Sequence, residues 1–157
     1  MKKVRLFFIH LFLLLSILFS SLLSSFLLVT QAHAVKPKAP DQVEGAKLVT
    51  ATEVIDLIMA NSNIVIVDAR RDTEYKKGHI EGAKNILDVE MTPDNLASII
   101  PKKHDQLIFY CNGPRCLRSS HAAEKAVSWG YTNVYWFKGG WSEWKKNNFP
   151  IAIANDK

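Results

Sequence analysis

Hydrophobic and polar positions divide the chain into a long apolar N-terminal segment and a longer region of mixed pattern. In the mixed region, continuous apolar runs stand at 64–67, 107–110 and 134–137, as in strands buried on both faces of a parallel sheet. Helical spacing of apolar residues between the runs is clearest at 119–129. The alternation of strands and helices predicts an α/β domain with a mostly parallel central sheet flanked by helices on both faces.

Shorter segments complete the predicted order of elements. Thr50 and Glu53 fit a capping box that begins one helix, and Thr92 followed by Pro93 begins another. Gly130 is placed to end the helix at 119–129. The other expected elements are an edge strand at 47–49, a helical turn at 74–75, a loop at 78–83, a strand at 85–87, a turn at 139–140 and a last helix at 141–146.

The apolar N-terminal segment has the three parts of a secretory signal peptide. A basic start precedes a run at 6–29 that contains no Asp, Glu, Lys or Arg, and the sequence Ala-x-Ala follows at 32–34. Because the run is also long enough to span a bilayer, an uncleaved anchor is the alternative. Both interpretations predict an exported protein, either periplasmic or anchored outside the cytoplasm, that meets the membrane only through this segment.

The expected organisation of the chain follows from these patterns. It consists of a signal peptide at 1–34, a linker at 35–46, one domain at 47–150 and a C-terminal tail at 151–157. Removal of the signal peptide would take three basic and no acidic residues from a chain of net charge +5. Charge therefore gives no reason to expect nucleic acid as a partner.

Candidate chemical groups follow the two most buried strands. Asp68 and Arg70 follow the run at 64–67, and Cys111 follows the run at 107–110. Sites in open α/β sheets form at the carboxyl ends of the strands. We therefore expect these residues at one edge of the sheet, with Asp68 and Arg70 as a polar pair that orders the loops near Cys111.

Cys111 stands between a strand and the beginning of a helix. The segment that connects them consists of Asn112, Gly113, Pro114, Arg115, Cys116, Leu117 and Arg118. Free amides of this segment and the positive charges of Arg115 and Arg118 are expected to stabilise a thiolate and to lower the pKa of Cys111. We interpret Cys111 as a nucleophile and residues 112–118 as its substrate-binding loop.

Two sets of motifs resemble the rhodanese family of sulfurtransferases. The first set is Asp68-Ala69-Arg70, Glu74-Tyr75, the segment 78–83 and Asn85-Ile86. The second set is Tyr110-Cys111, Arg118-Ser119, Ala122-Ala123, Gly130-Tyr131, Val134, Gly139-Gly140-Trp141 and Trp144. Together the motifs span about residues 47–150.

The resemblance implies a rhodanese-like fold and sulfur transfer. Cys111 would accept a sulfane sulfur from a small donor as a persulfide, held by the loop amides and Arg118. It would then pass the sulfur to a thiophilic acceptor such as cyanide, a thiol or a protein. The resemblance implies no metal and no organic cofactor.

The loop departs from the family pattern. Six residues separate Cys111 from Arg118 where the family has four, so the loop is longer by two and the substrate cannot be carried over. Cysteine phosphatases have five residues at this place, and neither Arg115 nor Arg118 fits that spacing.

Other candidates leave alternatives open. Cys116 could attack a persulfide on Cys111 or bridge to it, or it could be an inert part of the loop. A thiol-disulfide redox protein and a non-catalytic binding module are therefore the alternative functions. We expect His79 to pack behind the site, and Cys111, Cys116 and His121 fit no standard zinc spacing.

Overall fold

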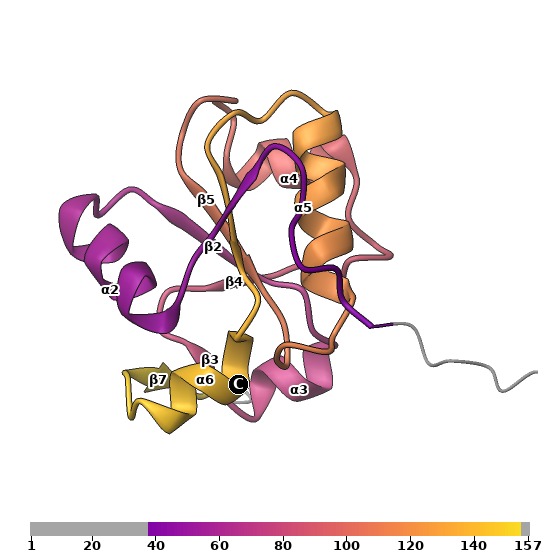
Figure 1. The fold of residues 1–157 in the computed structure, drawn as a ribbon. Helices are drawn as coiled ribbons and strands as arrows, with labels where there is room; N and C mark the ends of the chain where they lie inside the picture. Colours follow the sequence, from indigo (N-terminus) through magenta and orange to yellow (C-terminus); the bar gives the residue numbers. More distant parts are fainter. Residues whose placement is uncertain (1–37, 155–157) are drawn as a thin grey trace, which may run out of the picture. The chain divides into compact units, whose positions relative to one another are not determined.

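A five-stranded parallel sheet forms the centre of the protein in the computed structural model, which describes residues 38–154 (Figure 1). Its strands are β1 (Ala46–Leu48), β2 (Val65–Asp68), β4 (Lys84–Asn85), β5 (Leu107–Tyr110) and β6 (Val134–Phe137). They lie in the order β1-β6-β5-β2-β4, and every neighbouring pair is parallel. The predicted α/β class and mostly parallel sheet are confirmed.

Helices cover both faces of this sheet. The helices are α2 (Ala51–Ala60), α3 (Asp72–Lys76), α4 (Pro93–Ile99), α5 (Arg118–Ser128) and α6 (Gly140–Lys146). Side chains of the central strands alternate between two hydrophobic clusters, with Phe109 and Trp136 in the first and Ile108 and Tyr135 in the second. Residues of α4 and α5 complete the first cluster, and residues of α2 and α6 complete the second. Every residue of β5 is buried, as expected of a strand with a helix layer on each face.

Local sequence fixes where the helices begin and end. Thr50 donates its amide to the Glu53 carboxylate at 2.7 Å, and its hydroxyl accepts from the Glu53 amide, which is the predicted capping box. Thr92 makes the same arrangement with Asn95. Gly130 follows α5 with φ +87, a conformation that glycine adopts without strain.

Two terminal segments are more closely joined to the domain than expected. In place of part of the expected loop at 78–83, β3 (His79–Ile80) pairs antiparallel with β7 (Ile151–Ala152), which lies in the expected tail. Ala39 and Val43, in the expected linker, are 3% and 5% exposed and belong to the first hydrophobic cluster. A pair of two-residue strands carries too little pattern to be recognised in the sequence.

The predicted signal peptide at 1–34 lies outside the described residues. Within residues 38–154, no helix is long and apolar enough to cross a membrane. Export therefore stays a prediction.

Candidate active site

The loop between β5 and α5 holds both cysteines at the carboxyl edge of the sheet. Cys111 directly follows the last residue of β5, and Arg118 is the first residue of α5. Asp68 stands in register with Tyr110 at the end of the neighbouring strand β2. The structure therefore brings the two predicted segments to one edge.

Asp68 and Arg70 form a buried ion pair at this edge. Their side chains are 0% and 2% exposed, and the shortest distance between Arg70 Nη2 and Asp68 Oδ2 is 2.6 Å. The same nitrogen donates to the carbonyl oxygen of Gly78 at 2.7 Å, and the Tyr110 hydroxyl donates to Asp68. The Arg70 guanidinium lies 4.7 Å from the centre of the Trp141 ring. Arg70 thus holds neighbouring elements together and is closed to direct contact with a substrate.

The beginning of α6 is attached to the beginning of the cysteine loop. The amide of Trp141 donates to the carbonyl oxygen of Cys111 at 2.8 Å, and the amide of Ser142 donates to that of Asn112 at 3.0 Å. Gly140 makes this approach possible because a Cβ atom there would lie 2.2 Å from the Cys111 oxygen. Its φ of +53 also favours glycine.

Cys111 is enclosed by the protein. Its side chain is 0% exposed, and its Sγ atom lies 3.0 Å from Ser119 Oγ and 3.4 Å from the carbonyl oxygen of Cys116. A hydrogen bond with the Cys116 side chain and burial raise the pKa of the Cys111 thiol. This direction is opposite to the expected lowering, because the Cys116 side chain and burial outweigh the bonds from Ser119.

Cys116 lies where the loop donors converge. Arg118 Nε is 3.5 Å from Cys116 Sγ, and the amides of Asn112 and Arg118 also bond to this sulfur. The Cys111 side chain makes the largest contribution to lowering the pKa of Cys116, and the bonds from Arg118 and Asn112 add to it and outweigh burial. Of the two predicted stabilising arginines, Arg118 lies beside the sulfur of Cys116.

Glu74 joins the two ends of the loop, a role that sequence reasoning missed. Its carboxylate accepts from Arg118 Nη1 at 2.8 Å and from Asn112 Nδ2 at 2.7 Å. Partial burial would raise the pKa of Glu74, but these bonds and the Arg71 amide lower it to about 2. The sequence signal for this role is a carboxylate in the helical turn before Gly78 and His79, together with an arginine in the loop that can pair with it.

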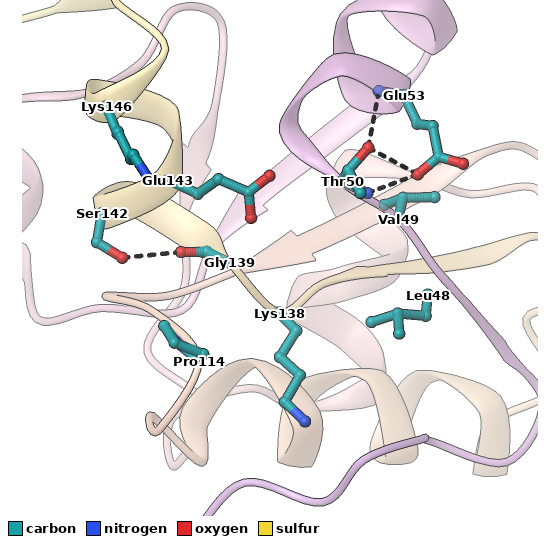
Figure 2. A pocket seen from close by; sticks show the side chains of 10 residues that line it. All are labelled: Leu48, Val49, Thr50, Glu53, Pro114, Lys138, Gly139, Ser142, Glu143 and Lys146. Atoms are coloured by element: carbon teal, nitrogen blue, oxygen red, sulfur yellow. Dashed lines mark hydrogen bonds between the residues drawn. The ribbon is translucent and has the colours of Figure 1, made fainter.

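Two cavities meet at the loop. The first, of about 520 Å³, is lined by Asn112, Gly113, Pro114, Arg115, Cys116, Arg118 and Ser142. Cys111 and Leu117 are absent from this lining. The second, of about 680 Å³, shares Pro114 and Ser142 with the first and continues past Lys138 towards the start of α2 (Figure 2). Cys116 is therefore the cysteine that faces space for a ligand.

Comparison with known proteins identifies the family. The family model for the rhodanese-like domain matches residues 50–147, well over half of the chain. The chain belongs to the rhodanese-like family. This confirms the family that the sequence motifs predicted.

Relatives with this domain include sulfurtransferases. The chain is 30% identical over 107 residues to the uncharacterized protein YibN of Escherichia coli, covering 68% of this chain and 72% of YibN. It is 30% identical over 99 residues to the thiosulfate sulfurtransferase GlpE of Stutzerimonas stutzeri, covering 63% of this chain and 85% of GlpE. A solved thiosulfate sulfurtransferase from Pseudomonas aeruginosa superposes with TM-score 0.62 at 26% identity, over 71% of this chain and 21% of that one.

The remaining candidates of this rhodanese-like domain have structural partners. His79 is 6% exposed, its ring stacks on Tyr75 with centroids 3.7 Å apart, and its Nδ1 lies 3.0 Å from the Tyr75 carbonyl oxygen. His121 lies 3.5 Å from Asp88. In the part of the chain that the structure describes, no three His, Cys, Asp or Glu side chains are grouped to hold a metal ion.

Proposed function

We propose that this rhodanese-like protein is a sulfurtransferase that carries sulfane sulfur as a persulfide on Cys116. The observation that carries the proposal is the set of donors around Cys116 Sγ, at the wall of the 520 Å³ cavity. Because these groups lower the pKa of the Cys116 thiol, they favour its thiolate form, which is the nucleophile. The same donors suit the persulfide anion that forms on this sulfur.

The proposed donor is thiosulfate or a chemically similar small anion. The Cys116 thiolate attacks the outer sulfur of thiosulfate, a new S–S bond forms, and the bond to the sulfonate sulfur breaks with release of sulfite. Arg115 and Arg118 line the cavity and supply positive charge for an anionic donor. The names of relatives such as GlpE support this class of donor.

A thiophilic acceptor completes the reaction by attacking the outer sulfur of the persulfide. The cavity shown in Figure 2 shares Pro114 and Ser142 with the cavity that Cys116 lines, and we propose that the acceptor approaches through it. Lys138 and Lys146 line this cavity together with Glu53 and Glu143, so the charge of the lining does not restrict the acceptor to an anion. We propose a small thiol, cyanide or an exposed protein thiol as the acceptor class.

The sequence predicted Cys111 as the residue that forms the persulfide. An experiment can distinguish Cys111 from Cys116 in this role. Full-length protein is reduced, freed of reductant and mixed with thiosulfate, and released sulfite is counted. We expect about one sulfite per wild-type molecule, release by Cys111→Ser, and none by Cys116→Ser. Thermal unfolding of each variant checks that it is folded.

Other results would overturn the assignment. Release of sulfite by Cys116→Ser but not by Cys111→Ser would show that Cys111 forms the persulfide. Absence of sulfite from the wild type, with cyanide and with a dithiol as acceptor, would refute sulfur transfer from thiosulfate.

We also propose that the protein is exported, on the strength of the basic, apolar and Ala-x-Ala segments at 1–34. Expression of the full chain with a C-terminal tag in a bacterial host, followed by fractionation and N-terminal sequencing, tests this. We expect a mature chain outside the cytoplasm that begins at Val35, or a membrane-bound chain that keeps the segment. Tagged protein confined to the cytoplasm with an intact N-terminus would refute export.

A further inference from the structure

A second thiol stands behind the proposed sulfur carrier, and the proposed transfer does not use it. Cys111 is 0% exposed and is absent from the lining of the 520 Å³ cavity. Many buried free cysteines act only as small apolar side chains. Cys111 differs because its Sγ atom lies 3.4 Å from the carbonyl oxygen of Cys116 and the Cys116 side chain is a cause of the raised pKa of its thiol, so the two cysteines are neighbours in the folded loop.

Polar groups are also directed at the Cys111 sulfur. Ser119 Oγ lies 3.0 Å from Cys111 Sγ, and the Ser119 amide bonds to the same sulfur. The indole N–H of Trp136 donates to Ser119 Oγ at 3.0 Å. Because this bond occupies an acceptor site of the Ser119 hydroxyl, the hydroxyl proton can be directed to Cys111. These donors can stabilise a Cys111 thiolate. A cysteine that acts only as an apolar packing residue does not need such donors.

We propose that Cys111 resolves the persulfide on Cys116, so that the protein releases the sulfane sulfur as hydrogen sulfide. This inference rests on the proposed persulfide at Cys116. The Cys111 sulfur attacks Cys116 Sγ, a bond between the two sulfurs forms, and the bond from Cys116 Sγ to the outer sulfur breaks. The outer sulfur leaves with the electron pair of that bond and takes the Cys111 proton as HS⁻.

The step balances without a further oxidant or reductant. Two cysteine sulfurs are oxidised to a disulfide, and the sulfane sulfur is reduced to sulfide. The persulfide anion and the neutral Cys111 thiol carry one negative charge before the step, and HS⁻ carries it afterwards. A dithiol reductant is needed only to open the disulfide for another cycle.

The arrangement of the two thiols gives the steps their order. While Cys116 is a thiolate, its proximity and burial keep Cys111 protonated, so only one sulfur can react with the donor. Formation of the persulfide moves the negative charge one atom outwards into the cavity. The main cause that holds the proton on Cys111 is thereby weakened, and the Ser119 donors remain in place.

The experiment follows one round of reaction in the reduced full chain with thiosulfate and without a reductant. Sulfite reports loading, sulfide reports resolution, and intact mass reports the product. We expect the wild type to release about equal amounts of sulfite and sulfide and to lose both free thiols. In Cys111→Ser and Cys111→Ala, we expect sulfite, sulfide below about a tenth of the wild-type amount, and a mass increased by one sulfur.

The same measurements separate failure of the inference from failure of the proposed function. Sulfite without sulfide in the wild type, or undiminished sulfide in both Cys111 variants, would refute resolution by Cys111 and leave Cys116 as the carrier. Absence of sulfite in the wild type would refute both proposals.

A neighbouring serine pair tests the positioning role of Ser119. Loss of its hydroxyl in Ser119→Ala should slow sulfide release by about threefold to tenfold while the final amount of sulfite is kept. Ser120→Ala is the matched control, because within residues 38–154 the Ser120 hydroxyl bonds to the Leu117 carbonyl oxygen and to neither sulfur. Equal slowing in both variants would show that the effect comes from a disturbed helix and would refute the role of Ser119.

Discussion

Two arginine–carboxylate pairs support the cysteine loop, and they differ in their contact with water. The side chains of Arg70 and Asp68 are 2% and 0% exposed, whereas those of Arg118 and Glu74 are 20% and 31% exposed. The first pair bonds to the carbonyl oxygen of Gly78 and to the hydroxyl of Tyr110. In the second pair, Arg118 reaches the Sγ atom of Cys116 and lines a cavity.

The difference explains what each pair can do. A buried ion pair must satisfy nearly all of its hydrogen bonds internally, and the loss of one partner leaves a charge without compensation. A partly exposed pair contributes little to the free energy of folding, but its arginine stays able to bind an anion. The same kinds of residue therefore serve the fold in one place and the chemistry in the other.

Replacement of Arg70 should give the largest change in stability. Arg70→Met leaves the Asp68 carboxylate buried without its cation, so the free energy of unfolding should fall by about 3–5 kcal/mol in urea unfolding. The matched variant Arg118→Met should lose about 1 kcal/mol or less. Equal losses in the two variants would contradict the comparison.

Replacement of Arg118 should act on the sulfur instead. Arg118→Met removes the cation beside Cys116 and should raise the pKa of that thiol by about one pH unit or more. The pH dependence of alkylation at Cys116, followed by peptide mass, measures this pKa. Arg115→Met is the control, since Arg115 is not among the groups that lower the pKa of Cys116. An unchanged alkylation profile in Arg118→Met would exclude Arg118 from the stabilisation of the thiolate.

The Glu74–Arg118 pair should respond to acid. The pKa of Glu74 is about 2 in the folded protein against a usual value of 4.5, so its ionised form stabilises the fold above about pH 4.5. That contribution is lost as the pH falls towards 2. Glu74→Gln should therefore be less stable than the wild type by about 1 kcal/mol near pH 6, and the difference should vanish near pH 2. A difference that is constant over this range would show that the charge of Glu74 is not responsible.

An exposed ion pair gives the smallest expected effect. Lys138 and Asp41 lie 2.9 Å apart at the surface, where the Asp41 side chain is 91% exposed. Water and salt screen such a pair, so Asp41→Asn should leave the melting temperature unchanged within error. A clear decrease would mean that the segment before β1 depends on this contact.

The sheet could be predicted because its pattern is local and strong. The apolar runs at 107–110 and 134–137 coincide with β5 and β6. Since parallel strands end at one edge, the meeting of Asp68 with the cysteine loop also followed from the order of elements. These conclusions required no knowledge of side-chain directions.

The roles of the two cysteines could not be predicted in the same way. Both lie within one irregular loop, where the direction of each sulfur depends on the backbone and on distant contacts. Glu74 holds the loop from α3 and the start of α6 holds it from the other end of the domain. Spacing along the chain indicates that a thiolate loop is present, but it does not tell which sulfur meets the donors.

The bonds from Trp141 and Ser142 to the cysteine loop bear on the biosynthesis of the protein. A ribosome delivers both cysteines well before it delivers α6, whose first amides hold the carbonyl groups of Cys111 and Asn112. Domains generally fold as units, and β6, which joins β1 to the rest of the sheet, directly precedes α6, so the sheet and these fixed points become available together. The cysteine loop therefore reaches its final conformation only in a nearly completed domain.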